Sequence, residues 1–87
     1  MAYFAVSYQL NKTKDYKPLW AALAKLNATK VMRDFYLVDV TSTAIELRNY
    51  LSKEVDADDM IFVVPFSRRP SYNRAFVGTN GWIAARF

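Results

Sequence analysis

The chain has 87 residues, a formal net charge of +4, no cysteine and no histidine. This length favours one domain, and the missing residue types exclude disulfides, thiolate or imidazole metal sites and histidine acid–base catalysis. Any metal would depend on carboxylates, so magnesium is the only cofactor to consider, and only if the protein is a nuclease. Apolar residues make up 53% of the sequence, which favours burial of some of them against a second copy of the chain.

The first segment with a clear pattern runs from Tyr3 to Leu10, where apolar residues alternate with milder ones and predict a strand. No basic leader precedes it and no apolar run is long enough to span a bilayer. We therefore expect a cytoplasmic protein without membrane contact. A basic turn follows, and Asp15 is placed to cap a helix from about Tyr16 to Leu26, in whose first turn Pro18 is tolerated.

The apolar stripe of that helix includes Trp20, which we expect in the core, and Asn27 is a suitable residue to end the helix. The segment from Thr29 to Val40 is rich in β-branched and aromatic residues and predicts extended structure. Arg33 and Asp34 in its middle fit either a tight turn or a bulge. The sequence therefore leaves open one bent strand or a hairpin of two.

A second helix is predicted after Thr43, which has the spacing of a capping box with Glu46. Its apolar stripe is Ala44, Leu47, Leu51 and Val55. An acidic loop over residues 56–59 leads to the last core strand, Met60 to Ser67. Pro65 cannot donate to a neighbouring strand, so this strand is expected at a sheet edge or with a bulge.

Beyond Ser67 the sequence is basic and rich in turn-forming residues. Residues 75–77 and 81–84 fit two short strands around a turn at 78–81. We therefore expect a strand-like C-terminal tail over residues 68–87.

The order of these elements predicts a single ferredoxin-like α+β domain, residues 1–87, of βαββαβ topology. Such a domain has an antiparallel sheet with both helices on one face. The other face is left open and partly apolar, so a partner is expected to cover it.

The chain also resembles the small CRISPR-associated protein that partners the spacer-acquisition integrase, most of all its divergent relatives outside CRISPR loci. The resemblance covers about residues 2–67 and rests on the order and spacing of several short motifs. These motifs are Val6–Leu10, Tyr16–Leu23, Asp34–Val38, Ile45–Leu51 and Asp56–Val64.

The resemblance implies a ferredoxin-like homodimer whose C-terminal segment pairs with the sheet of the other protomer. Some members of the family are described as metal-dependent nucleases and others as DNA-binding scaffolds. The family pattern has an aspartate after the strand-one tyrosine, where two protomers are proposed to share magnesium. Gln9 stands at that position here, and an uncharged amide is a poor ligand for a hard cation. We therefore predict no catalytic residue and no metal ligand at this position.

The densest basic cluster is expected to contact phosphates, with one tyrosine stacking on a base. Its members are Arg68, Arg69, Tyr72 and Arg74, and a second basic cluster contains Lys12, Lys14 and Lys17. The alternative interpretation is that both clusters are solvated loops.

The aspartates at positions 56, 58 and 59 lack the spacing of a calcium loop, so we interpret them as a solvated turn, and Asp39 as a lone surface acid. Among the tail aromatics we expect interface anchors. The predicted interface residues are Phe76, Trp82 and Ile83, with Phe87 as a further candidate.

The sequence thus favours a homodimeric, non-catalytic protein that binds DNA or RNA or serves as a scaffold for an integrase-like partner. A metal-dependent nuclease or toxin-type ribonuclease of the same fold, using Asp34 or Asp39, is one alternative. A phage or mobile-element protein-interaction module is another.

Overall fold

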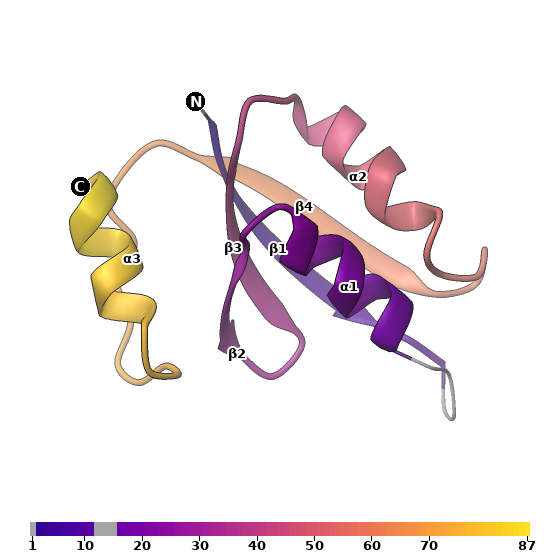
Figure 1. Ribbon diagram of the computed structural model, residues 1–87, viewed down its shortest axis with the longest axis horizontal. Coiled ribbons are helices and arrows are strands. Elements are labelled where there is room, and N and C mark those ends of the chain that lie inside the picture. Colours follow the sequence, from indigo (N-terminus) through magenta and orange to yellow (C-terminus); the bar gives the residue numbers. More distant parts are fainter. Residues whose placement is uncertain (1, 12–15) are drawn as a thin grey trace.

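The computed structural model describes residues 2–11 and 16–87 and contains a four-stranded antiparallel sheet and three helices. Figure 1 shows α1 and α2 on one side of the sheet and α3 on the other. The strands are β1 (Ala2–Gln9), β2 (Thr29–Met32), β3 (Phe35–Val40) and β4 (Met60–Phe66), and the helices are α1 (Lys17–Lys25), α2 (Ala44–Ser52) and α3 (Thr79–Arg86). This small α+β structure is consistent with the predicted fold class.

The sheet has the strand order β2-β3-β1-β4, with β1 antiparallel to both of its neighbours. β4 is therefore an edge strand, as Pro65 within it predicts. Val6 of β1 lies opposite Tyr36 of β3 and Val63 of β4. This register places the alternating apolar side chains of the three strands in common rows.

The segment that the sequence left open forms a hairpin. Arg33 and Asp34 make the turn between β2 and β3, and Asp34 has a left-handed φ of 61°, a conformation that aspartate adopts more readily than most residues. The β2–β3 register also shifts between Lys30 and Met32. The hairpin therefore contains an irregularity as well as a turn.

The end of α1 and the start of α2 have the capping residues that the sequence predicts. Asn27 has a φ of 56°, its amide donates to the carbonyl of Ala24, and the Ala28 amide donates to Leu23, which is the Schellman pattern at the end of α1. At the start of α2 the Thr43 and Glu46 side chains each accept a hydrogen bond from the other's amide. Pro18 lies in the first turn of α1, whereas the proposed cap Asp15 lies outside the described residues.

The main core lies between the sheet and the helices α1 and α2. Every other residue of the first strand faces it, from Phe4 to Leu10, and each of these side chains is buried. Leu19 and Leu23 of α1 and Leu47 and Leu51 of α2 pack against them. The prediction that Trp20 belongs to this core is wrong, because it lies at the edge of the layer with 38% of its surface exposed.

The predicted strand-like tail is also wrong, because residues 79–86 form the helix α3. Gly78 begins it with a φ of 100°, which a residue with a side chain rarely adopts. Trp82 and Ile83 then recur on one face of the helix and pack against Val31 and Leu37 of the sheet. The glycines that suggested a turn between strands in fact precede and occupy the first turn of a short helix.

α3 therefore covers part of the sheet face that we expected to be open. No helix among the described residues is long and apolar enough to cross a membrane.

Candidate subunit and nucleic-acid interface

The sheet face on which α3 packs is only partly covered by that helix. The part of this face that lies along β4 is exposed and apolar. Met60, Phe62 and Val64 are 64%, 70% and 42% exposed. They alternate along the strand and lie opposite Gln9, Ser7 and Ala5 of β1, whose side chains are on the face away from the main core. We call Met60, Phe62 and Val64 the β4 strip.

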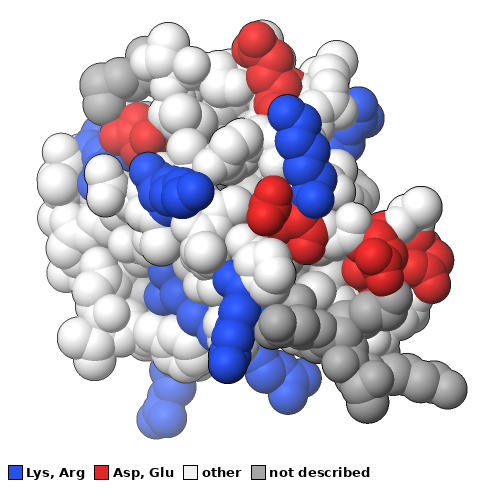
Figure 2. All heavy atoms as spheres, turned by 45° about the vertical axis from the view of Figure 1, so that its right-hand side comes forward, with Lys and Arg blue, Asp and Glu red and all other residues white. Residues whose placement is uncertain are grey.

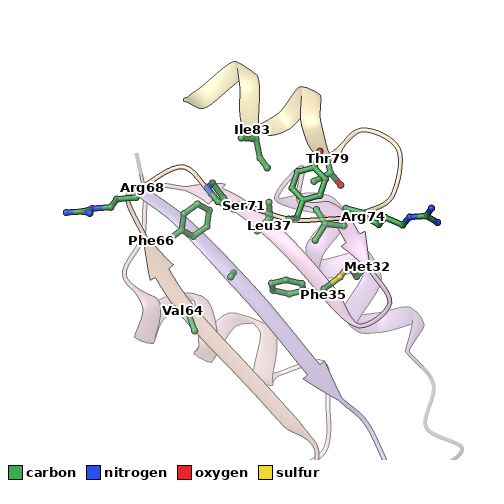
Figure 3. A pocket seen from close by; sticks show the side chains of 15 residues that line it. Met32, Phe35, Leu37, Val64, Phe66, Arg68, Ser71, Arg74, Thr79 and Ile83 are labelled. Carbon is green, nitrogen blue, oxygen red and sulfur yellow. The ribbon is translucent and has the colours of Figure 1, made fainter.

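An apolar groove of about 260 Å³ continues from the β4 strip and passes beneath the loop that leads to α3. The sheet forms its floor and Ile83 of α3 forms part of its wall. Figure 3 shows Phe35 and Phe66 on the sheet side, and Arg68 and Arg74 at opposite ends with their guanidinium groups directed outward. The groove therefore has an apolar interior and basic ends.

The loop over residues 67–78 carries the predicted basic cluster, and the structure exposes all of it. Arg68, Arg69 and Arg74 are exposed to solvent, and Tyr72 is close to half-exposed. The loop is attached to the sheet where the Phe76 amide donates to the carbonyl of Val31 at 2.8 Å. Arg68 and Arg74 thus lie at the two ends of a groove whose lining also includes Val64 of the β4 strip.

The second predicted basic cluster is not assembled in the described structure. Lys12 and Lys14 lie outside the described residues, and Lys17 is the first residue of α1. On the face displayed in Figure 2, basic and acidic side chains are interspersed. That face therefore has no broad field of one sign, and recognition there would depend on local contacts.

Gln9 lies at the end of β1 in an environment that does not fit a magnesium site. It is exposed, and the hollow beside it is lined by Ser7, Tyr8, Met60, Ile61 and Phe62. None of these described lining residues carries a carboxylate. The surroundings of Gln9 are apolar or hydroxyl-bearing, and a hard dication prefers charged oxygen ligands.

The three aspartates of the loop before β4 come together. Their carboxylate oxygens lie within 4.8 Å of one another. However, Asp59 accepts hydrogen bonds from the amides of Asn11 and Asp56, at 3.0 and 2.9 Å, and Asp58 accepts one from the Asn11 side chain at 2.7 Å. These contacts connect the end of β1 to the loop before β4, so the cluster has a structural role that the solvated-turn prediction did not include.

The acids considered for an alternative nuclease centre have other partners. Asp39 is largely buried and accepts a hydrogen bond from Nε of Arg86 at 2.8 Å. Asp34 lies in the hairpin turn, 3.9 Å from the exposed Arg33. The prediction that Asp39 is a lone surface acid is therefore wrong, because it holds the last turn of α3.

The predicted interface residues have different positions. Trp82 and Ile83 are buried against the chain's own sheet, so neither is exposed to a partner in this structure. Phe76 is half-exposed, and Phe87 packs near Tyr3 with a ring-centroid distance of 5.1 Å. Of the three predicted anchors, only Phe76 presents a large surface to solvent.

The sequence analysis missed the exposed apolar strip and the environment of Trp20. Residues 60–64 are apolar on both faces of the strand, so alternation does not distinguish the buried face from the exposed one. Around Trp20, the indole N–H donates to the hydroxyl of Tyr8 at 2.7 Å, and burial raises the pKa of Tyr8 to about 12.

No protein-family model matches the chain.

Proposed function

We propose that the chain is a ferredoxin-like βαββαβ domain that forms a homodimer and binds nucleic acid as a scaffold, without catalysing its cleavage. The observation that carries this proposal is one apolar groove that is lined by Val64 of the β4 strip and by Arg68 and Arg74 of the exposed arginine loop, residues 67–78. One feature is suited to phosphate contacts and the other to association with protein. Their proximity would bring the basic loops of two protomers near one shared interface.

The exposed β4 strip supports a homodimer. Three large apolar side chains on one edge strand are a poor solution for a small domain that stays alone. A second copy offers the same strip, so a two-fold arrangement would bury both strips with one set of contacts.

The side chains of the arginine loop support binding of nucleic acid. Arginine presents a planar fork that matches phosphate oxygens, and three arginines accompany one partly exposed tyrosine. Contacts of this kind position a protein on a backbone without reading sequence. We therefore expect non-specific binding.

The side chain at position 9 is uncharged, which argues against metal-dependent catalysis there. Gln9 supplies neither a negative ligand nor a general base, and the hollow beside it brings no carboxylate among its described residues. The proposal therefore assigns magnesium no role at that position. Gln9→Ala should leave any nuclease activity of the preparation unchanged.

The test is a salt-titrated binding assay with labelled duplex DNA, run with and without magnesium. We expect binding at low salt, no cleavage, and a steep fall in affinity as salt rises. Replacing Arg68, Arg69 and Arg74 by alanine should weaken binding and reduce the salt slope by up to roughly 3 units, at about 0.9 per phosphate contact. Lys53→Ala, on the exposed end of α2, is a control for loss of charge alone.

Two outcomes would overturn parts of the proposal. Magnesium-dependent cleavage that falls many-fold in Gln9→Ala would restore the nuclease hypothesis. Absence of binding by the wild-type chain at low salt would remove the nucleic-acid function, and would favour a protein-interaction module that uses the same β4 strip.

A further inference from the structure

Trp20 is the one large aromatic side chain of α1 that the core does not enclose, and it lies over a shallow hollow. The hollow is lined by Tyr16, Trp20, Lys30, Arg33 and Asp34, and its volume is about 480 Å³. The hollow is at the β2 edge of the layer formed by α1, since Lys30 belongs to β2 and Arg33 to the hairpin turn.

The indole ring of Trp20 is held in place although much of it is exposed. Its N–H donates to the Tyr8 hydroxyl at 2.7 Å, and its ring is 5.6 Å from that of Tyr16, with 39° between the planes. Tyr8 is itself buried in the core. The ring is therefore oriented by the fold before any ligand binds, which reduces the entropy lost on binding.

Two cations lie beside this ring. The ammonium of Lys30 is 4.7 Å from the centroid of the Trp20 ring. Arg33 is almost fully exposed, and its nearest described acid, Asp34, is 3.9 Å away, a distance at which a surface ion pair contributes little. Both cations are free to move onto an anionic group without loss of a strong contact.

We propose that the Tyr16–Trp20 hollow binds single-stranded nucleic acid, with a base stacked on Trp20 and the neighbouring phosphates on Lys30 and Arg33. A base stacked on an aromatic side chain contributes more binding free energy than an exposed cation–π contact does. The base therefore displaces the Lys30 ammonium from the ring, and the ammonium moves to the backbone. A paired base in a duplex presents no free face to Trp20, so the site selects single strands.

This inference deepens the proposed function, because it adds a second site and names the form of nucleic acid that this site takes. The two sites differ in position and in chemistry. The arginine loop leads into α3 and offers three arginines to phosphates, whereas the hollow lies beside α1 and is centred on the Trp20 ring.

The test is a titration of the full chain with a short oligothymidylate, followed by tryptophan fluorescence and by anisotropy of a labelled strand. We expect the emission of the exposed Trp20 to be quenched while the buried Trp82 remains unaffected. Trp20→Ala should weaken single-strand binding roughly 5- to 150-fold, which corresponds to the loss of one stacked base. Trp20→Phe keeps a stacking ring and should stay within a few-fold of wild type.

The charge contribution is tested with a matched pair of variants. Lys30→Ala should reduce the salt slope by about 0.7, the value for one phosphate contact on a single strand. Lys53→Ala removes the same charge from the exposed end of α2 and should leave the slope unchanged. Circular dichroism and thermal melting of each variant show whether a loss of binding comes from unfolding.

The outcomes separate this inference from the proposed function. Oligothymidylate that binds with no change in Trp20 emission and with equal affinity for Trp20→Ala would overturn the site and leave the arginine loop intact. Equal quenching by a duplex would overturn the selection for single strands. Absence of any binding at low salt would overturn both proposals.

Discussion

The sheet face under α1 and α2 buries Phe4, Val6 and Val38 to 2% exposure or less, whereas the opposite face leaves Met60, Phe62 and Val64 in solvent. Two nine-residue helices with apolar stripes cover the first face. A single eight-residue helix covers the second. The first face therefore supplies most of the buried apolar core, and the second keeps a strip of apolar side chains in solvent.

The two tryptophans also differ between the faces, in burial and in hydrogen bonding. Trp82 is buried under α3, and its indole N–H has no acceptor among the described residues. Trp20 is partly exposed, yet its N–H is satisfied by Tyr8. An unsatisfied buried donor costs free energy, so α3 is attached less favourably than its apolar contacts alone suggest.

The largest expected loss of stability comes from substitutions on the sheet face that α1 and α2 cover. Leu51→Ala removes a fully buried side chain of α2 and should lower the free energy of unfolding by about 2–5 kcal/mol. Val64→Ala, on the exposed strip, should cost the isolated chain about 1 kcal/mol or less. Urea unfolding at low protein concentration measures both values, and equal losses would contradict the difference between the faces.

The next effect is a loss of stability at alkaline pH that originates on the same side of the sheet. Burial raises the pKa of Tyr8 from about 10 to about 12. Between these values the unfolded chain releases the proton and the folded chain retains it, so stability is full below pH 10 and falls as pH rises toward 12. The contribution is on the order of 2 kcal/mol.

Chemical unfolding at a series of pH values tests this expectation. Tyr8→Phe should flatten part of the decline between pH 10 and 12. The remaining slope should come from other tyrosines, since burial also raises the pKa of Tyr36. An unaltered profile in Tyr8→Phe would assign the alkaline transition to a different group.

A smaller effect is expected where α3 meets the sheet. Arg86→Ala removes the 2.8 Å contact with the largely buried Asp39 and the cation–π contact with Trp82, whose ring centroid is 4.1 Å from the guanidinium carbon. The loss should be about 1–3 kcal/mol, because it leaves a buried carboxylate without its charged donor. Arg33→Ala breaks only the exposed 3.9 Å pair with Asp34 and should change the free energy of unfolding by less than about 0.5 kcal/mol.

Hydrogen exchange of the α3 amides locates this effect. Faster exchange in Arg86→Ala confined to residues 79–87 would show that the ion pair holds the helix on the sheet. Unchanged exchange there would show that Trp82 and Ile83 hold the helix without it.

Local signals predicted the face under the long helices well. The alternation of the first strand, the left-handed Asn27 and the capping box of Thr43 and Glu46 each act through neighbours in the chain, so the sequence contains them directly. Pro65 likewise predicted an edge strand, since its missing donor is a property of the residue itself. The acidic loop was placed correctly, but its contacts with Asn11 join segments 47 and 48 residues apart, which no local pattern reveals.

The tail and the site were predicted less well for the same physical reason. Eight residues with one glycine among them and another at the N-cap have little intrinsic helical preference, and α3 is stabilised by packing of Trp82 and Ile83 on distant strands. The exposure of Phe62 and of Trp20 depends on which elements pack against them. This packing is not a local property, so no sequence pattern predicts it. The arginine loop was located correctly as an exposed segment, because charge and turn-forming residues are local properties.

The most direct test of the account is the molecular mass in solution, by sedimentation equilibrium, of the wild-type chain and of two matched variants. Phe62→Glu charges the centre of the β4 strip, and Ile45→Glu charges a similarly exposed side chain on α2, away from the α3 face. The account predicts a wild-type dimer, a folded monomer for Phe62→Glu and a dimer for Ile45→Glu. A monomeric wild type at high concentration, or a Phe62→Glu variant that remains a dimer, would contradict the claim that the β4 strip is the interface.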